Sequence, residues 1–263
     1  MCRLCTTRPV GWSTSRRRSV PKVGYKNRPE VIAKLEDIWR IVYRVDDIKS
    51  CAMSALRLSG CVILLNGFPG VGKLTIARCL QSALVNVRSR LIDNHLMIDP
   101  AEAIYPGRGA PYRVFRDRMR QAIFDDLKAL PEDDTVLIMT CSLGANFEDA
   151  AVFAEYLEVA RSRNMPCYTF TMYCVREQHK LRLQSPDRIL GERSKLVQPA
   201  VLDDLLSNNE LLNPFDRSLG YEFEIGMHLK HSSLDVIELT PEESADRILN
   251  IIIQDLEGAG GKD

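Results

Sequence analysis

The sequence predicts an α/β fold in three layers: a five-stranded parallel sheet with helices on both faces. Short apolar segments alternate with helical patterns across residues 58–257, which is the order of elements that a parallel sheet with crossover helices requires. The first apolar segment, Cys61–Asn66, leads into a glycine-rich turn and then a helical pattern. With 263 residues, 45% of them apolar, the chain has enough material to bury the core of such a domain.

Five mainly apolar runs are the expected strands. They are short, as buried strands usually are, and each is followed by a turn or by a helical pattern. In chain order, they are Cys61–Asn66, Ser89–Asp93, Thr135–Thr140, Cys167–Cys174 and Leu234–Leu239.

Four helices are expected to cover the sheet. The first begins after the glycine-rich turn, at Thr75, and extends to about residue 85. The second, near Tyr112–Leu130, places four apolar side chains on one face: Phe115, Met119, Ile123 and Leu127. The third spans Phe147–Arg161. The last opens with the capping box Thr240–Glu243, has proline at its first position, and runs through Ile252.

The glycine-rich turn has the sequence GFPGVGKLT and the GxxxxGK spacing of a phosphate-binding loop. Its glycines let the backbone curl with the N–H groups pointing inward, and the N-terminus of the following helix adds a partial positive charge. Lys73 is expected to reach the β- and γ-phosphates as a point charge. The residues expected to bind the nucleotide are Gly67, Gly70, Val71, Gly72, Lys73, Leu74 and Thr75.

One residue departs from the phosphate-loop pattern. The position after Lys73 is normally Ser or Thr, whose hydroxyl ligates Mg²⁺, but this chain has Leu74. Thr75 is rotated by about 100° on the helix and cannot take over that position, so we expect it to contact the α-phosphate. Because Mg²⁺ often retains several waters, nucleotide binding should survive the change, whereas metal affinity should be weaker.

A carboxylate is expected at the carboxyl end of the second strand. Motor-type and switch NTPases end their third strand in an acid that holds Mg²⁺ through water, but here that strand ends in Thr140-Cys141-Ser142. Asp93 could instead orient or deprotonate an acceptor hydroxyl, and could hold Mg²⁺ through water. The alternative is that Asp93 only stabilises the following turn. His95 is a second candidate base or substrate contact, or else a structural hydrogen-bond partner.

Five arginines crowd the segment after the second strand. They are Arg108, Arg113, Arg116, Arg118 and Arg120. Bidentate guanidinium groups would suit an acceptor that carries a carboxylate or phosphate. The alternative is a solvated helix face with acidic partners elsewhere. Arg108, in the Tyr105–Gly109 loop, is the strongest candidate for substrate binding.

Together, the phosphate loop and Asp93 resemble the P-loop small-molecule kinases of the shikimate kinase, gluconate kinase and chloramphenicol phosphotransferase group. The resemblance covers residues 58–257. It implies ATP as the phosphoryl donor, with Mg²⁺, and Asp93 facing the acceptor hydroxyl. It also implies an arginine-bearing lid at Arg182–Leu196, in which Arg188 and Arg193 would stabilise the transferring phosphoryl group. Each could instead be an exposed loop arginine.

The resulting prediction is an ATP-binding phosphotransferase that moves the γ-phosphoryl group to a hydroxyl of a small molecule. A nucleoside or nucleotide kinase is an alternative, which would need aromatic stacking near Tyr105 and Tyr112. A non-catalytic nucleotide-binding regulatory module is another, favoured by Leu74 and by the missing acid of the third strand. The sequence specifies neither the acceptor nor the oligomeric state.

The two ends of the chain are expected to lie outside the kinase domain. Residues 1–29 carry eight basic side chains and no acid, and are expected to be a disordered tail. Residues 30–57 are expected to be a helical extension, and residues 258–263 a disordered tail. The expected location is the cytoplasm. The alternative is the mitochondrion, because the basic tail also resembles a transit peptide. Met53 could instead be a start codon.

Charge and hydropathy exclude two kinds of partner. Beyond the basic tail, acidic residues outnumber basic ones by eight, which argues against a nucleic-acid-binding surface. No apolar run approaches the roughly 18 residues that a bilayer crossing needs. The cysteines outside Cys2 and Cys5 fall mostly in expected strands and helices, as reduced intracellular thiols do.

Overall fold

The computed structural model describes residues 58, 60–186 and 195–259. All of them belong to one of the two compact units into which the chain divides, Asp46–Asp263. The expected basic tail (1–29) and helical extension (30–57) lie outside the described residues, as do residues 260–263. Two expected site residues, Arg188 and Arg193, also lie outside this part.

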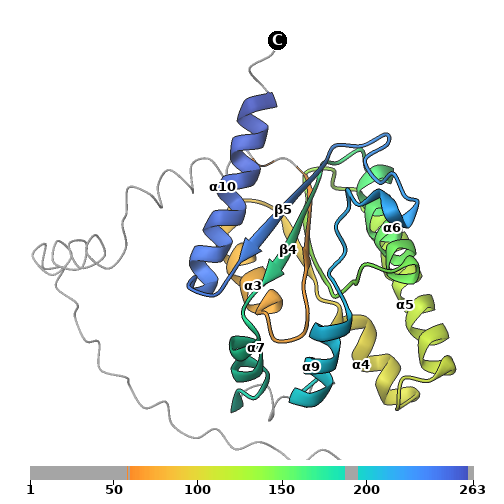
Figure 1. Ribbon diagram of the computed structural model, residues 1–263. Coiled ribbons are helices and arrows are strands. Elements are labelled where there is room, and N and C mark those ends of the chain that lie inside the picture. The colour runs from red at the N-terminus through yellow and green to blue at the C-terminus, as the bar shows by residue number, and fades with distance from the viewer. Residues whose placement is uncertain (1–57, 59, 187–194, 260–263) are drawn as a thin grey trace, which may run out of the picture. The chain divides into compact units, whose positions relative to one another are not determined.

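The sheet confirms the predicted fold class. Five parallel strands are arranged in the order β2-β3-β1-β4-β5 (Figure 1). β1, which carries the glycine-rich turn, lies at the centre and pairs with β3 and β4. Ligands of such sheets bind outside the carboxyl ends of the strands, where the strand order reverses. The strand bounds are β1 Val62–Asn66, β2 Ser89–Ile92, β3 Val136–Cys141, β4 Cys167–Tyr173 and β5 Leu229–Asp235.

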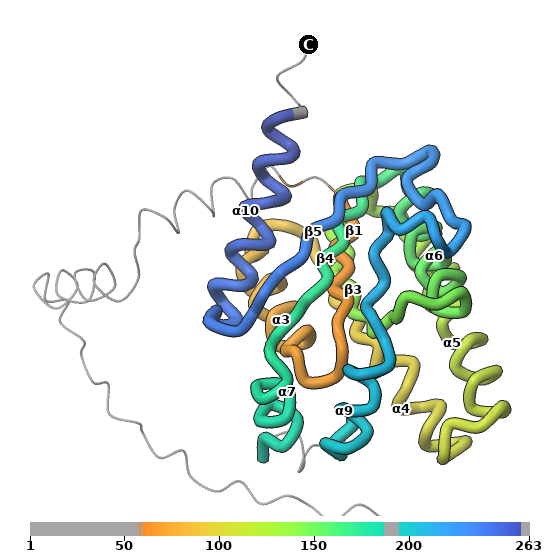
Figure 2. The backbone as a smooth tube through the Cα atoms, in the orientation of Figure 1, coloured from red at the N-terminus to blue at the C-terminus, as the bar shows by residue number. Residues whose placement is uncertain are grey.

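Helices cover both faces of the sheet (Figures 1 and 2). One face is covered by α3 (Lys73–Ala83) and α10 (Pro241–Ala259), and the other by α5 (Ala110–Lys128) and α6 (Phe147–Ser162). Successive side chains of a strand point to opposite faces, so β1 contributes to both cores: Ile63 and Leu65 to one, Val62 and Leu64 to the other. Every residue of β1 is buried, which explains why its sequence is apolar as far as Asn66, its last residue.

Three further helices lie at the carboxyl edge of the sheet and were not predicted. They are α4 (His95–Ile104), α7 (Arg176–Leu183) and α9 (Pro199–Asn208), which Figure 1 shows near the ends of the strands. Among the described residues, none of the helices combines the length and the apolar composition needed to cross a membrane.

Two details of the expected elements are wrong. The last strand was expected at Leu234–Leu239, but β5 begins at Leu229 and ends at Asp235. β5 is an edge strand whose sequence, LKHSSLD, is mostly polar, so an apolar run that begins at its last two residues was mistaken for the strand. α10 continues to Ala259, two residues into the segment expected to be a tail.

Candidate functional site

The phosphate loop connects β1 to α3 at the centre of the sheet's carboxyl edge. Gly70 and Gly72 adopt left-handed backbone conformations with φ of 92° and 106°, which side chains other than glycine's rarely allow. Gly67 is required for a different reason. A Cβ there would lie 2.9 Å from Val71 Cγ1 and 3.1 Å from the carbonyl oxygen of Met172 in β4. The glycines predicted from the motif therefore each have a steric basis.

Lys73, the first residue of α3, folds back over the loop. Its Nζ donates hydrogen bonds to the carbonyl oxygens of Gly67 and Phe68, the latter at 3.1 Å. The ammonium therefore lies over the loop, where its positive charge would face a bound phosphate. Leu74 is half-buried and Thr75 is exposed. The structure places an apolar side chain where the usual hydroxyl ligand would be.

Helix α7 contacts the phosphate loop from the side of β4. His179 is buried, with 3% of its surface exposed, and its Nδ1 lies 3.1 Å from the carbonyl oxygen of Pro69. Arg182, one turn later, donates from Nη1 to the carbonyl oxygen of Val71 at 2.9 Å. His179 was assigned no role from the sequence, and Arg182 was expected only as the first residue of the lid. Since α7 is short and strongly polar, the sequence gives no pattern that would have indicated the contact.

Asp93 lies just beyond β2 and is buried, with 6% of its surface exposed. Thr140 Oγ1, at the end of β3, donates to Asp93 Oδ1 at 2.8 Å and accepts from the backbone N–H of Asn94 at 3.0 Å. The hydroxyl of Thr140 thus fixes the orientation of the carboxylate. It occupies the position at the end of β3 where an acid was noted to be missing.

Two arginines of α5, Arg116 and Arg120, make different contacts. Arg116 Nη2 donates to Asn94 Oδ1 at 3.2 Å, next to Asp93, and its buried Nε has no hydrogen-bond partner in the described part of the chain. Arg120 is buried against α6, where Nε and Nη2 donate to the carboxylate of Glu155 at 2.7 and 3.2 Å. Arg116 therefore borders the Asp93 site, whereas Arg120 joins two helices.

Two other candidates take part in local contacts. His95 Nδ1 lies 2.9 Å from Asp99 Oδ1, one turn further along α4, so both side chains belong to the same helix. Arg108 is exposed, with its Nε 3.5 Å from Glu102 Oε2. It also has a positive φ of 56°, and Gly107 N–H donates to Glu102 Oε1 at 3.0 Å.

The aromatic side chains near these residues differ in accessibility. Tyr112 is buried, with 3% exposed, and is not available to stack on a base. Tyr105 is 41% exposed, but its ring packs edge-on against Phe115, with the centroids 5.8 Å apart. Of these two tyrosines, Tyr105 is therefore the accessible one.

The structure brings the phosphate loop and Asp93 to the same edge of the sheet. β3 lies between β1 and β2, so Thr140 is on the strand between the one that leads into the loop and the one that leads into Asp93. Among the residues that the structure describes, no group of three or more histidine, cysteine, aspartate or glutamate side chains could hold a metal ion alone.

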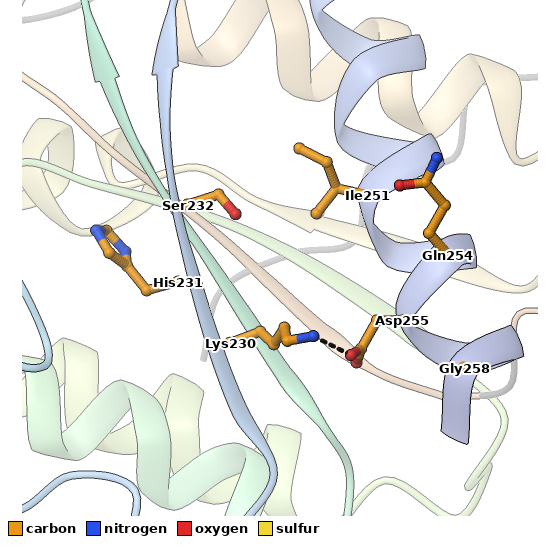
Figure 3. A pocket seen from close by; sticks show the side chains of 7 residues that line it. All are labelled: Lys230, His231, Ser232, Ile251, Gln254, Asp255 and Gly258. Carbon is orange, nitrogen blue, oxygen red and sulfur yellow. Dashed lines mark hydrogen bonds and ion pairs between the residues drawn. The ribbon is translucent and has the colours of Figure 1, made fainter. Parts of the chain in front are cut away.

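A separate pocket lies between β5 and α10 (Figure 3). Lys230 and Asp255 form an ion pair across it, and Asp255 also contacts His228 Nε2 at 2.7 Å and Tyr168 OH at 3.1 Å. Lys230 is the second residue of β5, so the pocket is near the amino ends of the strands. It is therefore away from the edge that carries the phosphate loop.

Comparison with known proteins gives matches in structure only. No protein-family model matches the sequence, and no curated protein matches it. A protein from Chloroflexus aurantiacus described as a candidate kinase superposes with a TM-score of 0.51 at 15% identity, covering 77% of this chain and 98% of that protein. Shikimate kinase from Acinetobacter baumannii (TM-score 0.46, 18% identity) and a gluconokinase from Sinorhizobium meliloti (0.47, 13%) match over the same shares of each chain. The chain therefore has the three-layer fold of the P-loop small-molecule kinases, as its sequence predicts.

Proposed function

We propose that the protein is an ATP-dependent phosphotransferase that moves the γ-phosphoryl group of ATP to a hydroxyl of a small molecule. One observation carries the proposal: a glycine loop with Lys73 folded over it shares one sheet edge with Asp93, a buried carboxylate fixed by Thr140. The loop could bind the phosphates of a nucleoside triphosphate, and the carboxylate could orient and deprotonate an acceptor hydroxyl.

The residues of the loop fit a nucleotide. Gly70 and Gly72 have left-handed φ values, so their backbone forms the kind of concave amide surface that holds phosphate. Mg²⁺ would be held by phosphate oxygens and water, with Asp93 reaching it through water, because Leu74 offers no hydroxyl. When bound, the ion would neutralise charge that develops on the phosphate oxygens.

In the proposed reaction, the acceptor oxygen forms a bond to the γ-phosphorus while the bond from that phosphorus to ADP breaks. Asp93 orients the acceptor hydroxyl and takes its proton as the new bond forms. Lys73 holds the phosphate oxygens in line for the displacement. We propose that Arg188 and Arg193 add positive charge at the transferring group, as the resemblance to P-loop kinases implies.

We further propose that the acceptor is anionic. Arg116 borders Asp93 through Asn94 and has a buried Nε without a partner in the described residues, so a carboxylate or phosphate of the acceptor would satisfy it. Arg108 and His95 remain candidate substrate contacts, although both already have carboxylate neighbours. The shikimate kinase and gluconokinase that this fold resembles are named for acceptors that carry a carboxylate and hydroxyls.

A non-catalytic nucleotide-binding module is the second candidate. It is supported by Leu74, which removes a metal ligand from the loop, and by Thr140, which stands where other NTPases have an acid. Such a protein would bind nucleotide and hydrolyse it slowly, and no acceptor would accelerate the hydrolysis.

The deciding experiment measures ADP release with a panel of alcohols, sugar acids, antibiotics and nucleosides as candidate acceptors. Acceleration by one class, together with its phosphorylated product in the mass spectrum, would support the kinase. The control is Lys73→Ala, which should abolish the acceleration. Tight ADP binding without acceleration by any class would support the regulatory module.

A further inference from the structure

Two side chains of α7 donate hydrogen bonds to carbonyl groups of the phosphate loop. His179 Nδ1 lies 3.1 Å from the carbonyl oxygen of Pro69, and Arg182 Nη1 lies 2.9 Å from that of Val71. Arg182 Nη2 also reaches the carbonyl oxygen of Val236, just after β5, at 3.0 Å. The contacts are close-packed, because a Cβ on Gly70 would lie 3.1 Å from the carbonyl oxygen of His179.

The tautomer of His179 follows from its hydrogen-bond partner, the carbonyl oxygen of Pro69. A carbonyl oxygen can only accept, so Nδ1 of His179 must carry the hydrogen. Burial lowers the pKa of His179, and the nearby charges of Lys73 and Arg182 lower it further, which outweighs the opposing effect of the hydrogen bond to Pro69. The ring is therefore neutral near pH 7, with its hydrogen on the nitrogen that faces the loop.

Holding these carbonyl groups also fixes the next amide in the chain. In a trans peptide, the C=O of one residue and the N–H of the next point in opposite directions. His179 holds the carbonyl of Pro69, so the N–H of Gly70 points away from α7. Arg182 holds the carbonyl of Val71, so the N–H of Gly72 does the same. These two are the glycines of the loop that have left-handed φ values.

We propose that His179 and Arg182 are positioning residues, which aim the N–H groups of Gly70 and Gly72 at the phosphates of a bound nucleotide. The proposal rests on the proposed function, because it requires nucleotide in the loop. Neither side chain needs to touch the nucleotide for this role. Arg182 also links the loop to the end of β5, so three segments distant in sequence are held by one guanidinium group.

The first test compares two substitutions of His179 by calorimetry with ADP. His179→Leu keeps an apolar side chain but removes the donor, and should weaken ADP binding by about tenfold through the loss of pre-aligned amides. His179→Asn places an N–H close to the position of Nδ1, and should restore affinity to within about threefold of wild type. The matched control is His231→Leu, which removes a partly buried histidine that contacts Thr169 instead.

The second test uses Arg182 in the same assay. Arg182→Met should weaken ADP binding by more than tenfold, because two charge-assisted donors are lost, and Arg182→Lys should recover only part of that affinity. The control is Arg176→Met on the same helix, whose guanidinium contacts Asp203 and Ser207 and should leave affinity unchanged. Equal losses at both positions would show a general effect of α7 and would overturn the proposal.

A third measurement needs no substitution. Nitrogen NMR of the wild-type ring should show the hydrogen of His179 on Nδ1, and the amide protons of Gly70 and Gly72 should shift strongly when ADP is added. A hydrogen on Nε2, or unshifted glycine amides, would overturn the proposal even if the variants fail to fold. If wild type binds no ADP, the proposed function fails and this inference fails with it. If wild type binds ADP and His179→Leu binds it equally well, only this inference fails.

Discussion

Removing Glu155 should destabilise the protein more than removing its partner Arg120, although both substitutions break the same ion pair. The guanidinium of Arg120 is 5% exposed and bonds Glu155 in a bidentate manner, with Asp117 at 2.9 Å as a second partner. Glu155 and Asp117 are 35% and 51% exposed. The pair joins α5 to α6 on the face of the sheet that borders the Asp93 site.

The asymmetry follows from which charge remains buried. Glu155→Ala leaves a buried cation with a single, mostly solvated partner, and breaking a buried pair in this way typically costs about 3 kcal/mol or more. Arg120→Met leaves carboxylates that water can reach and fills the space with an apolar chain, so a loss of about 1 kcal/mol is expected. The double variant should resemble Arg120→Met, because it removes the stranded cation.

Thermal and urea denaturation measure these differences. For a domain of this size, the melting temperature should fall by roughly 6–12 °C in Glu155→Ala and by roughly 2–4 °C in Arg120→Met. Arg118→Met, an exposed arginine on the same helix, is the control and should change stability by less than about 0.5 kcal/mol. A Glu155→Ala protein at least as stable as Arg120→Met would refute the reasoning, as would a double variant less stable than both.

Four further predictions concern the site and its surroundings. Lys73→Ala should weaken ATP binding by about tenfold or more in calorimetry, because one charge-assisted phosphate contact is lost. Leu74→Ser should shift half-activation to lower Mg²⁺ concentration by restoring the hydroxyl ligand. Asp93→Asn should keep its melting temperature but lower turnover by about 10²–10⁴-fold, because Asn still accepts from the neighbouring threonine but cannot take a proton. Burial lowers the pKa of His179 and His231, so the free energy of unfolding should fall as pH drops from about 7 to about 5, where the unfolded chain binds more protons than the folded protein.

Each of these predictions has an outcome that contradicts it. Unchanged ATP affinity in Lys73→Ala would remove the nucleotide assignment of the loop. An unmoved magnesium titration in Leu74→Ser would mean that position 74 faces away from the metal. Near-normal turnover in Asp93→Asn would exclude a catalytic role and turn attention to His95. For the pH prediction, urea denaturation of His179→Asn should show a shallower pH dependence than wild type, and an identical slope would contradict it.

The sheet could be predicted because its central strands are buried on both faces and therefore mostly apolar. β1 and β3 satisfy this, and their expected bounds differ from the structure by one residue at most. The edge strand β5 does not, since most of its residues are polar and partly accessible, and its expected position was wrong. An apolar run therefore predicted the position of a strand only where both faces of that strand are buried.

The helices at the carboxyl edge could not be predicted in this way. α4 contains Pro100, which normally argues against a helix interior, and α7 has eight residues with little apolar content. Both are held by contacts with other elements and not by a strong local pattern. His179 and Arg182 are on one of these helices, so their contacts with the loop became visible only in three dimensions.

For the candidate site, the conformation of the loop was predictable because its residues belong to a motif. The glycines and Lys73 follow from spacing alone, and the structure gives each glycine a steric reason. The arginine cluster is different, because Arg116 and Arg120 lie one helical turn apart and were expected as members of one cluster. A slight rotation between them is enough to direct Arg116 to Asn94 and Arg120 to α6. Spacing identifies a shared face but not which neighbour each side chain meets.

The end of β3 shows why a missing motif residue need not mean a missing function. The sequence has no acid there, which by itself favours a protein without catalysis. In the structure, Thr140 occupies that end, and its hydroxyl binds Asp93 from the neighbouring strand while accepting the N–H of Asn94. The carboxylate therefore follows β2 and is oriented by β3, so residues of two adjacent strands together position it. If this division is functional, Thr140→Val should lower turnover while leaving ATP affinity unchanged, because the hydroxyl acts on the carboxylate and not on the phosphate loop. Equal loss of turnover and of ATP affinity would instead mean that Thr140 supports the whole edge of the sheet.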